Sequence, residues 1–286
     1  MNNFIHKLKF FILNVGYAVH DKDWNWNDIR SPFARLYLVT EGKGRLKLDS
    51  GIYDLTPGHL YLIPSFVLHS DICDGVFEHY YLHIYEDSNS EDRFFEDLQF
   101  PLEVAAEDID SLLFKRICEL NPMMKLPHSN PVSYDNDQSL FQNIQRNKLC
   151  DNYKQIESEG IVFQLVSRFL KDARAKEASE DNRIQNALIY IRKNINSQLD
   201  IDQLSKIAFL SRDHFIRLFK KEVGQTPLSY ITQRKIEKAE LILATTDIPV
   251  KQIAFDLGYD DNSYFNRLFK DKIGITPQQY RESRKK

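Results

Sequence analysis

The 286-residue sequence contains no run of about 18 or more apolar residues, so we expect no membrane-spanning helix. Its N-terminal end also lacks the pattern of a secretory signal peptide. The short apolar run 10–13 is followed by Asn14, Tyr17 and His20, without a small-residue cleavage site. These absences argue against membrane and secreted proteins, and we expect a cytoplasmic location.

Cysteine is scarce and scattered. The three cysteines, Cys73, Cys118 and Cys150, are odd in number and widely spaced, so they form neither a CxxC metal motif nor a disulfide framework. We expect them to be free thiols in a reducing compartment.

The composition that is present is typical of a globular protein. Residues are 42% hydrophobic and 28% charged, and the length suits about two domains of ~100–200 residues. The net charge of −3 conceals an asymmetry, because residues 181–286 carry a net +6 and the remainder a net −9. A basic C-terminal part suits a polyanion such as DNA, since phosphate neutralisation supplies most of the non-specific affinity.

The first hundred residues predict strands. Segments 36–39, 44–48, 60–64 and 79–85 are rich in Leu, Ile, Val and Tyr, and turn residues punctuate them. Residues 45–49 alternate apolar and polar side chains, as a half-buried strand does. Several short strands at this spacing indicate a small all-β barrel or sandwich.

Residues 105–180 predict helices. Over 108–119 apolar side chains recur at helical spacing, and a loop with three prolines is expected at 121–136. A second amphipathic pattern follows it, and the polar stretch 171–182 is expected to be a linker or a frayed helix end. The apolar residues of the two helical patterns are Ile109, Leu112, Leu113, Ile117 and Leu120, then Leu140, Phe141, Ile144, Ile156, Ile161, Phe163, Leu165 and Phe169.

The C-terminal part contains an internal repeat. Residues 217–230 read RLFKKEVGQTPLSY and residues 267–280 read RLFKDKIGITPQQY, with eight identical residues in register at an offset of 50. Each copy follows a short apolar helix, expected over 201–209 and 250–257. A duplicated supersecondary unit explains this pattern.

Signals for helix starts and stops recur in both copies. An N-cap residue precedes each second helix, a glycine follows it in a position suited to left-handed backbone, and a Thr-Pro pair then starts another helix. A long helix over 227–244 would join the two units. The signals are Ser211, Gly224 and Thr226-Pro227, then Asp260 or Asp261, Gly274 and Thr276-Pro277.

A short helix, a tight turn and a second helix with a polar free face is the helix-turn-helix plan, whose second helix enters the major groove. With Phe215, Leu218 and Phe219 buried in the first copy and Phe265, Leu268 and Phe269 in the second, the outward residues are expected to contact DNA. Arg suits guanine, Asn suits adenine, Ile suits a thymine methyl group and Lys suits phosphate. The candidate DNA-binding residues are Arg212, Asp213, Ile216, Arg217 and Lys220, and Asp261, Asn262, Ser263, Asn266, Arg267 and Lys270.

Residues 184–284 resemble the AraC-type DNA-binding domain. The resemblance rests on IAFDLGY at 253–259, SYFNRLFK at 263–270 and GITPQQYR at 274–281. It implies seven helices in two helix-turn-helix subdomains with one linking helix, and both recognition helices in successive major-groove segments. Phe209 departs from the family, which often has glycine at this turn.

Residues 35–70 resemble the cupin-like effector half of AraC-type regulators. The segments YLVTEGKG at 37–44 and DLTPGHLYLIP at 54–64 follow its strand-turn-strand pattern, and His69 stands where such barrels carry a late histidine. Metal-binding cupins also need an earlier His-x-His and glutamate group, whereas GRLKL at 44–48 stands there in this sequence. We therefore expect no metal and no cofactor.

The same resemblance implies that the barrel binds a small effector, often a sugar. Sugar sites pair an aromatic face with polar groups. Helices over 138–175 resemble the region through which family members dimerise, although their apolar stripe could equally pack on the barrel. The candidate effector-binding residues, each of which could also be an ordinary core or surface residue, are Trp24, Trp26, Arg35, Tyr37, His69 and His83.

Together these patterns predict a multi-domain α and β protein. A cupin-like effector-binding domain would span 1–105, a helical dimerisation region and linker 106–178, and an AraC-type DNA-binding domain 182–286. The expected function is a sequence-specific DNA-binding transcription regulator, an activator that responds to a small effector such as a sugar. The expected partners are double-stranded DNA, the effector, a second copy of the chain and RNA polymerase.

Other functions stay open. The chain could be a regulator without a small ligand, whose N-terminal half serves only assembly, or a cupin enzyme fused to a DNA-binding domain. An enzyme would need a metal cluster or a paired acid and base, and the sequence offers neither at recognisable spacing. Repair of alkylated DNA through a reactive cysteine would need a clustered zinc-site pattern, which the three cysteines do not form. We therefore expect no enzymatic activity.

Overall fold

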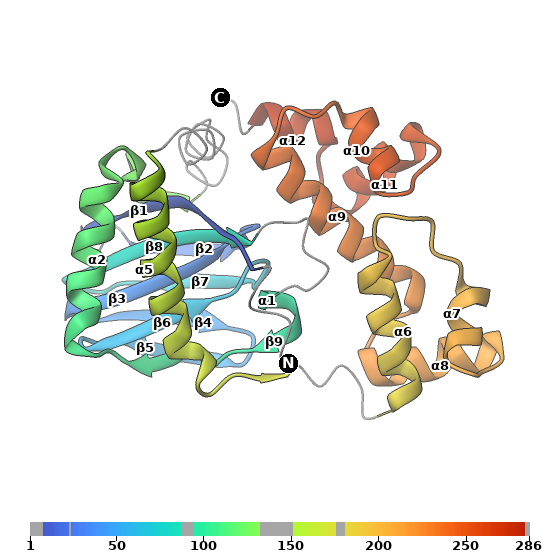
Figure 1. Ribbon diagram of the computed structural model, residues 1–286, viewed down its shortest axis with the longest axis horizontal. Coiled ribbons are helices and arrows are strands. Elements are labelled where there is room, and N and C mark those ends of the chain that lie inside the picture. Colours follow the sequence, from blue (N-terminus) through green and yellow to red (C-terminus); the bar gives the residue numbers. More distant parts are fainter. Residues whose placement is uncertain (1–7, 23, 87–93, 132–150, 176–180, 284–286) are drawn as a thin grey trace. The chain divides into compact units, whose positions relative to one another are not determined.

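The computed structural model describes residues 8–22, 24–86, 94–131, 151–175 and 181–283. The described residues up to Ala175 form one compact unit, and those from Asp181 to Ser283 form another (Figure 1). No helix in these ranges is both long and apolar enough to cross a bilayer. The predicted fold class, a β-rich N-terminal part with helices and an all-helical C-terminal part, is confirmed.

The N-terminal unit is built on antiparallel sheets. A five-stranded sheet has the order β1-β8-β3-β6-β10, and a four-stranded sheet has the order β2-β7-β4-β5. The four strand segments expected from the sequence correspond to β3, β4, β6 and β8. The strands are β1 Phe10–His20, β2 Trp26–Ile29, β3 Ala34–Gly42, β4 Gly44–Leu48, β5 Gly51–Leu55, β6 His59–Ile63, β7 His69–Ile72, β8 Phe77–Glu86 and β10 Glu103–Ala105.

Strand β3 is buried on both faces. Leu36 and Leu38 belong to the apolar cluster beneath the helices, whereas Tyr37 and Val39 belong to the cluster between the sheets. Side chains alternate along a strand, so these two pairs point to opposite faces. This double burial explains why β3 reads as a nearly continuous apolar run, whereas β4, a partly exposed strand of the other sheet, alternates.

Two helices, α2 Asp108–Leu120 and α5 Asn152–Leu170, cover the outer face of the five-stranded sheet (Figure 1). The expected helix at 108–119 is confirmed, but its apolar face was partly wrong, since Ile109 and Leu112 are exposed and Phe114 is buried. The buried Asp110 accepts a hydrogen bond from Arg168 Nε over 3.1 Å and turns this helix toward α5.

The second amphipathic pattern is confirmed in part. Ile161, Leu165 and Phe169 of α5 are buried, but Ile156 is exposed. Leu140, Phe141 and Ile144 lie outside the described residues. Of the expected loop at 121–136, the described residues 121–131 include the short 3-10 helix η2 Pro122–Met124.

The stretch expected to be a linker begins with an ordered strand. Strand β11 Arg174–Ala175 pairs with β9 Leu98–Gln99, which follows the short helix α1 Phe94–Asp97. The chain is therefore fastened to the N-terminal unit as far as Ala175.

Residues 182–283 form seven helices, as the resemblance implied. The apolar side chains form two clusters, one in each helix-turn-helix unit, and the long helix α9 contributes Ile231 to the first and Ile236 and Leu243 to the second. The helices are α6 Asn182–Lys193, α7 Ile201–Ile207, α8 Arg212–Val223, α9 Pro227–Thr245, α10 Val250–Asp256, α11 Asn262–Ile273 and α12 Pro277–Ser283.

Most of the expected capping signals act where the sequence placed them, although Ser211 precedes α8 without a capping hydrogen bond from its side chain. Gly224 and Gly274 end α8 and α11 with φ angles of +81° and +88°. Thr226 Oγ1 accepts from Ser229 N over 3.3 Å at the start of α9. Asp261, and not Asp260, is the N-cap of α11. Such caps satisfy backbone groups that a helix end leaves without partners.

The turns of the two helix-turn-helix units differ. The first turn places Phe209 in the left-handed region with φ +54°, and the second places Gly258 there with φ +72°. One residue separates Phe209 from the N-cap Ser211, whereas two separate Gly258 from the N-cap Asp261. The second turn is therefore one residue longer, and the two copies are not interchangeable.

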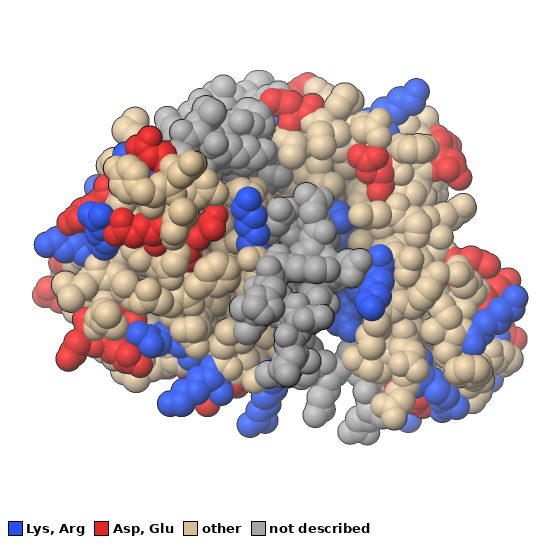
Figure 2. Space-filling model, in the orientation of Figure 1, with Lys and Arg blue, Asp and Glu red and all other residues tan. Residues whose placement is uncertain are grey.

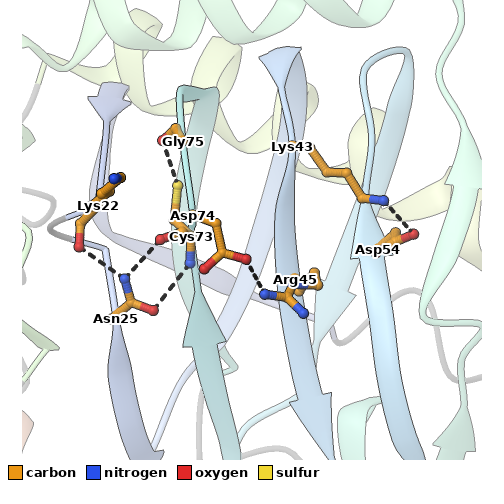
Figure 3. Close-up of polar contacts among 8 residues, drawn as sticks. All are labelled: Lys22, Asn25, Lys43, Arg45, Asp54, Cys73, Asp74 and Gly75. Atoms are coloured by element: carbon orange, nitrogen blue, oxygen red, sulfur yellow. Dashed lines mark hydrogen bonds and ion pairs between the residues drawn. The ribbon is translucent and has the colours of Figure 1, made fainter.

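A side-chain clamp fastens the start of β2 to the end of β7 (Figure 3). Asn25 Nδ2 donates to the carbonyls of Lys22 and Cys73 over 2.9 Å each, and Asn25 Oδ1 accepts from Cys73 N over 3.3 Å. Nearby ion pairs, Arg45 with Asp74 and Lys43 with Asp54, join neighbouring strands and turns. The clamp fixes the backbone next to Trp24, which is buried between the sheets.

Candidate functional site

Helix α8 presents a polar face. Phe215 and Phe219 are fully buried beneath it, and Asp213, Arg217 and Lys220 are exposed. This division follows the helical period, because residues three and four apart share a face. The three exposed residues are therefore free to meet a partner, as the sequence predicted.

Two other candidates of α8 have contacts within the protein. Arg212 Nη1 lies 3.2 Å from Asp202 Oδ1 of α7, in an exposed ion pair. Ile216 is half-buried and packs against the core of the first unit, so its position is less outward than expected.

Helix α11 repeats this arrangement. Ser263, Arg267 and Lys270 are exposed over the buried Phe265 and Phe269. The corresponding positions in α8 are 213, 217 and 220, at the offset of the repeat.

The remaining candidates of α11 either cap the helix or are half-buried. Asp261 accepts hydrogen bonds from Ser263 N over 2.7 Å and Tyr264 N over 3.3 Å, so its carboxylate caps the helix. Asn262 and Asn266 are half-buried.

Sequence reasoning missed two exposed residues of these faces. His214 and Tyr264 occupy equivalent positions of the repeat, one helical turn before Arg217 and Arg267. Their side chains share the exposed face because residues at a spacing of three are neighbours. The register of the repeat was the signal that could have identified them.

Figure 2 shows acidic and basic side chains interspersed on the face of the molecule in view. The net charge of +6 in the C-terminal part is therefore not gathered into a single basic patch there. Lys220 and Lys221 lie in the last turn of α8, and Lys270 and Lys272 lie in the last turn of α11, where cations also complement the helix dipole.

The two helix-turn-helix units contact each other around Lys235. Lys235 Nζ, on α9, donates to Ser197 O over 2.8 Å and lies 4.9 Å from the ring centre of Tyr259. A Cβ atom at Gly258 would lie 2.4 Å from the carbonyl carbon of Ser197. The turn of the second unit therefore lies directly against the backbone of the first.

A cavity of about 190 Å³ opens in the N-terminal unit. Of the candidate effector-binding residues, the structure places Trp24, Tyr37 and His83 in its wall. The described residues that line it are Tyr17, Ala18, Val19, His20, Trp24, Tyr37, His79, Tyr81, His83, Lys125, Leu126, Pro127, His128 and Ser129.

Trp26, Arg35 and His69 do not line this cavity. Arg35 is buried, donates to Ser31 Oγ over 2.7 Å and stands opposite His83 in the pairing of β3 with β8. His69 Nδ1 bonds to the Val67 carbonyl over 3.0 Å. Trp26 is half-buried and packs against the core between the sheets.

Burial keeps the barrel histidines neutral. It lowers the pKa of His69 to about 3, with the charge of Arg35 as the second cause. It also lowers the pKa of His79 and His83 well below 6.5, and Arg35 again contributes at His83. Such histidines act as hydrogen-bonding groups at neutral pH, not as cations.

Strand β8 carries three side chains of the wall, two of which sequence reasoning missed. His79, Tyr81 and His83 stand two residues apart and therefore point to the same face of the strand. This alternation was readable in the sequence. Lys125–Ser129, which comes from a separate part of the chain, was not foreseeable from any local pattern.

Metal-dependent and thiol-based catalysis find little support in the described residues. They contain no group of three or more His, Cys, Asp and Glu side chains placed to hold a metal ion. Burial raises the pKa of Cys118 to about 11, so its thiol stays protonated and weakly nucleophilic. The thiol of Cys73 is buried and donates to Gly75 O over 2.9 Å, and Cys150 lies outside the described ranges.

Two family models match the chain. One, described as an AraC-like ligand binding domain, matches residues 11–106, and the other, described as a helix-turn-helix domain, matches residues 204–283. The first falls on the barrel and the second on both helix-turn-helix units.

Curated relatives also match the chain. The HTH-type transcriptional activator RhaS of Mannheimia succiniciproducens is 24% identical over 241 residues, which cover 81% of this chain and 80% of RhaS. The arabinose operon regulatory protein of Escherichia coli is 33% identical over 85 residues, 29% of each chain. The chain spans about a fifth to a half of the length of the first curated relatives that it matches.

Among solved structures, the C-terminal domain of the response regulator yesN from Fusobacterium nucleatum is 34% identical. The match covers 35% of this chain and 98% of that domain, with a TM-score of 0.34.

Proposed function

Because the chain belongs to the AraC family of regulators, we propose that it is a sequence-specific DNA-binding activator of transcription that responds to a small effector. The observation that carries this proposal is the repeated exposed face. Two helices, α8 and α11, present polar side chains in equivalent positions over fully buried phenylalanines.

In this proposal α8 and α11 each enter a major groove segment. Arg217 and Arg267 would pair with guanine, and Lys220 and Lys270 would meet phosphate. Arg212, Asp213, Ile216, Asp261, Asn262, Ser263 and Asn266 remain candidates, with Arg212 released from Asp202 on binding and Asp261 acting through the cap of α11.

The barrel cavity is the proposed effector site. Trp24 and Tyr37 offer aromatic faces and His83 a polar group, which is the combination that sugar sites use. Relatives named for arabinose and lactose operons support a sugar-type effector. Trp26, Arg35 and His69 would support the wall from behind.

Assembly and partners are part of the same proposal. Ile109 and Leu112 of α2 and Ile156 of α5 are exposed apolar residues on the helices of the proposed dimerisation region. A homodimer would double the DNA site, and an activator would also contact RNA polymerase. A regulator whose N-terminal half serves only assembly is the alternative, and ligand binding separates the two. The relatives are transcription regulators, which supports a role without catalysis.

DNA binding is tested with the purified chain and the DNA upstream of its own and neighbouring genes, across a salt series, against random DNA. Specific binding should prefer one segment. Arg217→Ala and Arg267→Ala should each cost about 1–3 kcal/mol at that segment and relax preference at one base pair.

Arginine-to-lysine variants provide the control, because lysine keeps the charge and loses the two-pronged guanine contact. If Arg217→Lys restores full affinity and preference, this arginine contacts phosphate only. Equal weak binding of all DNA by the unaltered chain would contradict sequence-specific reading.

A further inference from the structure

The wall of the barrel cavity is rich in histidine and tyrosine side chains and has no described carboxylate. Among the described residues it contains four histidines and one lysine, His20, His79, His83, His128 and Lys125, and three tyrosines, but no Asp or Glu. The hydroxyl groups of an uncharged sugar need acceptors as well as donors, whereas a carboxylate needs donors only. Neutral imidazoles and tyrosine hydroxyls can donate as well as accept, and with a lysine and no described carboxylate beside them the wall favours an anion.

The hydroxyl of Tyr81, one of the tyrosines of the wall, can donate a hydrogen bond to a ligand. Tyr81 Oη accepts a hydrogen bond from Leu126 N over 2.8 Å, so its own proton remains available for another partner. Burial raises the pKa of Tyr81 to about 12, which keeps this proton in place at neutral pH. A Cβ atom at Gly16 would lie 2.4 Å from Tyr81 Oη, so the glycine makes room for the hydroxyl.

Two imidazoles add further hydrogen-bonding groups. The Asn14 amide nitrogen can only donate, so His83 Nδ1 accepts from it over 3.4 Å and the ring proton belongs on Nε2. His79 is buried, and its Nδ1 has no hydrogen-bond partner among the described residues. A buried polar atom of this kind is costly unless a ligand or water satisfies it.

The positive charge of the site comes from Lys125, at the edge of the wall. Lys125 is exposed, and it is followed by the residues that complete the lining. The nearby carboxylate of Glu78 is already engaged by Tyr17 Oη over 2.5 Å and does not line the cavity. An incoming anion would therefore meet a cation and hydrogen-bond donors.

We propose that this cavity binds a small organic acid through its carboxylate, with Lys125 at the mouth and Tyr81, His79 and His83 as the wall groups that hold it. Trp24 and Tyr37 then offer aromatic faces to the uncharged part. The proposal rests on the proposed function only in taking the cavity as the effector site, and it replaces an uncharged sugar with an acid of similar size, such as a sugar acid, as the effector.

The test is a thermal-shift and calorimetric comparison of matched probes on the full chain without DNA. The pairs are galacturonate with galactose, glucuronate with glucose, and benzoate with benzyl alcohol, at constant ionic strength. At least one acid should raise the melting temperature, and its uncharged counterpart should not. An uncharged probe that stabilises the protein as strongly as its acid, or a panel in which no acid stabilises it, overturns the proposal.

Variants locate the binding of the acid that stabilises best. Lys125→Gln should weaken it about 2- to 5-fold, the range of an exposed ion pair. Tyr81→Phe should weaken it about tenfold, as the loss of a hydrogen bond to a charged group would. Lys115→Gln, on the exposed face of α2, should change nothing, and all variants should keep the fold of the ligand-free protein.

If neither Lys125→Gln nor Tyr81→Phe weakens the acid, the proposal is wrong about the site. The outcome is independent of DNA. A chain that binds the acid yet reads no DNA sequence contradicts the proposed function alone, and a chain that reads DNA but prefers the uncharged probes contradicts this inference alone.

Discussion

The ammonium group of Lys235 donates a hydrogen bond of 2.8 Å to the backbone carbonyl of Ser197, across the boundary between the two helix-turn-helix units. The same group faces the ring of Tyr259, which follows α10 in the second unit. One buried side chain of α9 thus contacts the loop between α6 and α7 in the first unit and the turn of the second unit. Burial lowers the pKa of Lys235 to about 8.

This lowered pKa predicts a rise in stability at alkaline pH. The unfolded lysine has a pKa of about 10.4, so between about 8 and that value the unfolded state binds more protons, and the free energy of unfolding increases with pH. Urea denaturation followed by helical circular dichroism should show this rise. Lys235→Met should remove it, and Lys251→Met, at an exposed position of α10, should keep it. An unchanged slope in Lys235→Met would contradict the assignment.

Two glycine variants separate backbone strain from close approach. Gly274 has φ +88° and no neighbour within 4 Å of an added Cβ, so Gly274→Ala should cost about 1–2 kcal/mol of stability from the left-handed backbone alone. Gly258→Ala adds a clash with Ser197, and we expect about 2–4 kcal/mol in total. Equal losses in thermal denaturation would mean that the contact relaxes freely.

Phe209 is a position where a substitution should increase the stability of the protein. Its φ is +54° and its side chain is 88% exposed, so glycine would relieve the backbone and sacrifice little burial. After the conformational freedom of glycine is counted, Phe209→Gly should stabilise the protein by about 0.5–1 kcal/mol. Phe255→Gly, at an exposed site inside α10, should instead destabilise it by about 0.5 kcal/mol. A loss of stability in Phe209→Gly would show that the ring makes a contact of value.

The buried histidines predict sensitivity to acid. Because the folded pKa values of His69, His79 and His83 lie below the unfolded value of about 6.5, the unfolded state binds more protons below that pH. Their contribution is complete above about pH 6.5 and is lost as pH falls toward the folded values, by up to about 1.4 kcal/mol per pH unit for each group. The melting temperature of the barrel should fall from pH 7 to pH 4. A barrel equally stable at both would exclude neutral burial of the three rings.

The DNA-binding half could be predicted closely because its signals are local. A Thr-Pro pair starts α9 and α12, and glycines end α8 and α11, since each acts on the backbone a few residues away. The exposed faces then follow from the helical period. Contacts such as Arg212 with Asp202 or the burial of Ile216 depend on the packing of separate helices, so the sequence did not indicate them.

The barrel was harder to predict because its determinants are distant in sequence. Strand β1 includes Asn14 and Gly16, which obscure its pattern, yet both serve the cavity through His83 and Tyr81. The face of α2 is set by the pairing of Asp110 with Arg168, 58 residues later. The repeating side chains of β8 were visible, but their partner Leu126 was not.

The contact of Gly258 with the Ser197 backbone has a consequence for the promoters that this protein would recognise. If α8 and α11 are held at one separation, the DNA-binding half would fit only one spacing between its two target segments. One inserted base pair between its two target segments would rotate the second segment by about 35° around the double helix and move it about 3.4 Å along the axis. A contact without room for a methyl group leaves the protein little freedom to follow, so a single insertion would silence a site as fully as the loss of a critical base.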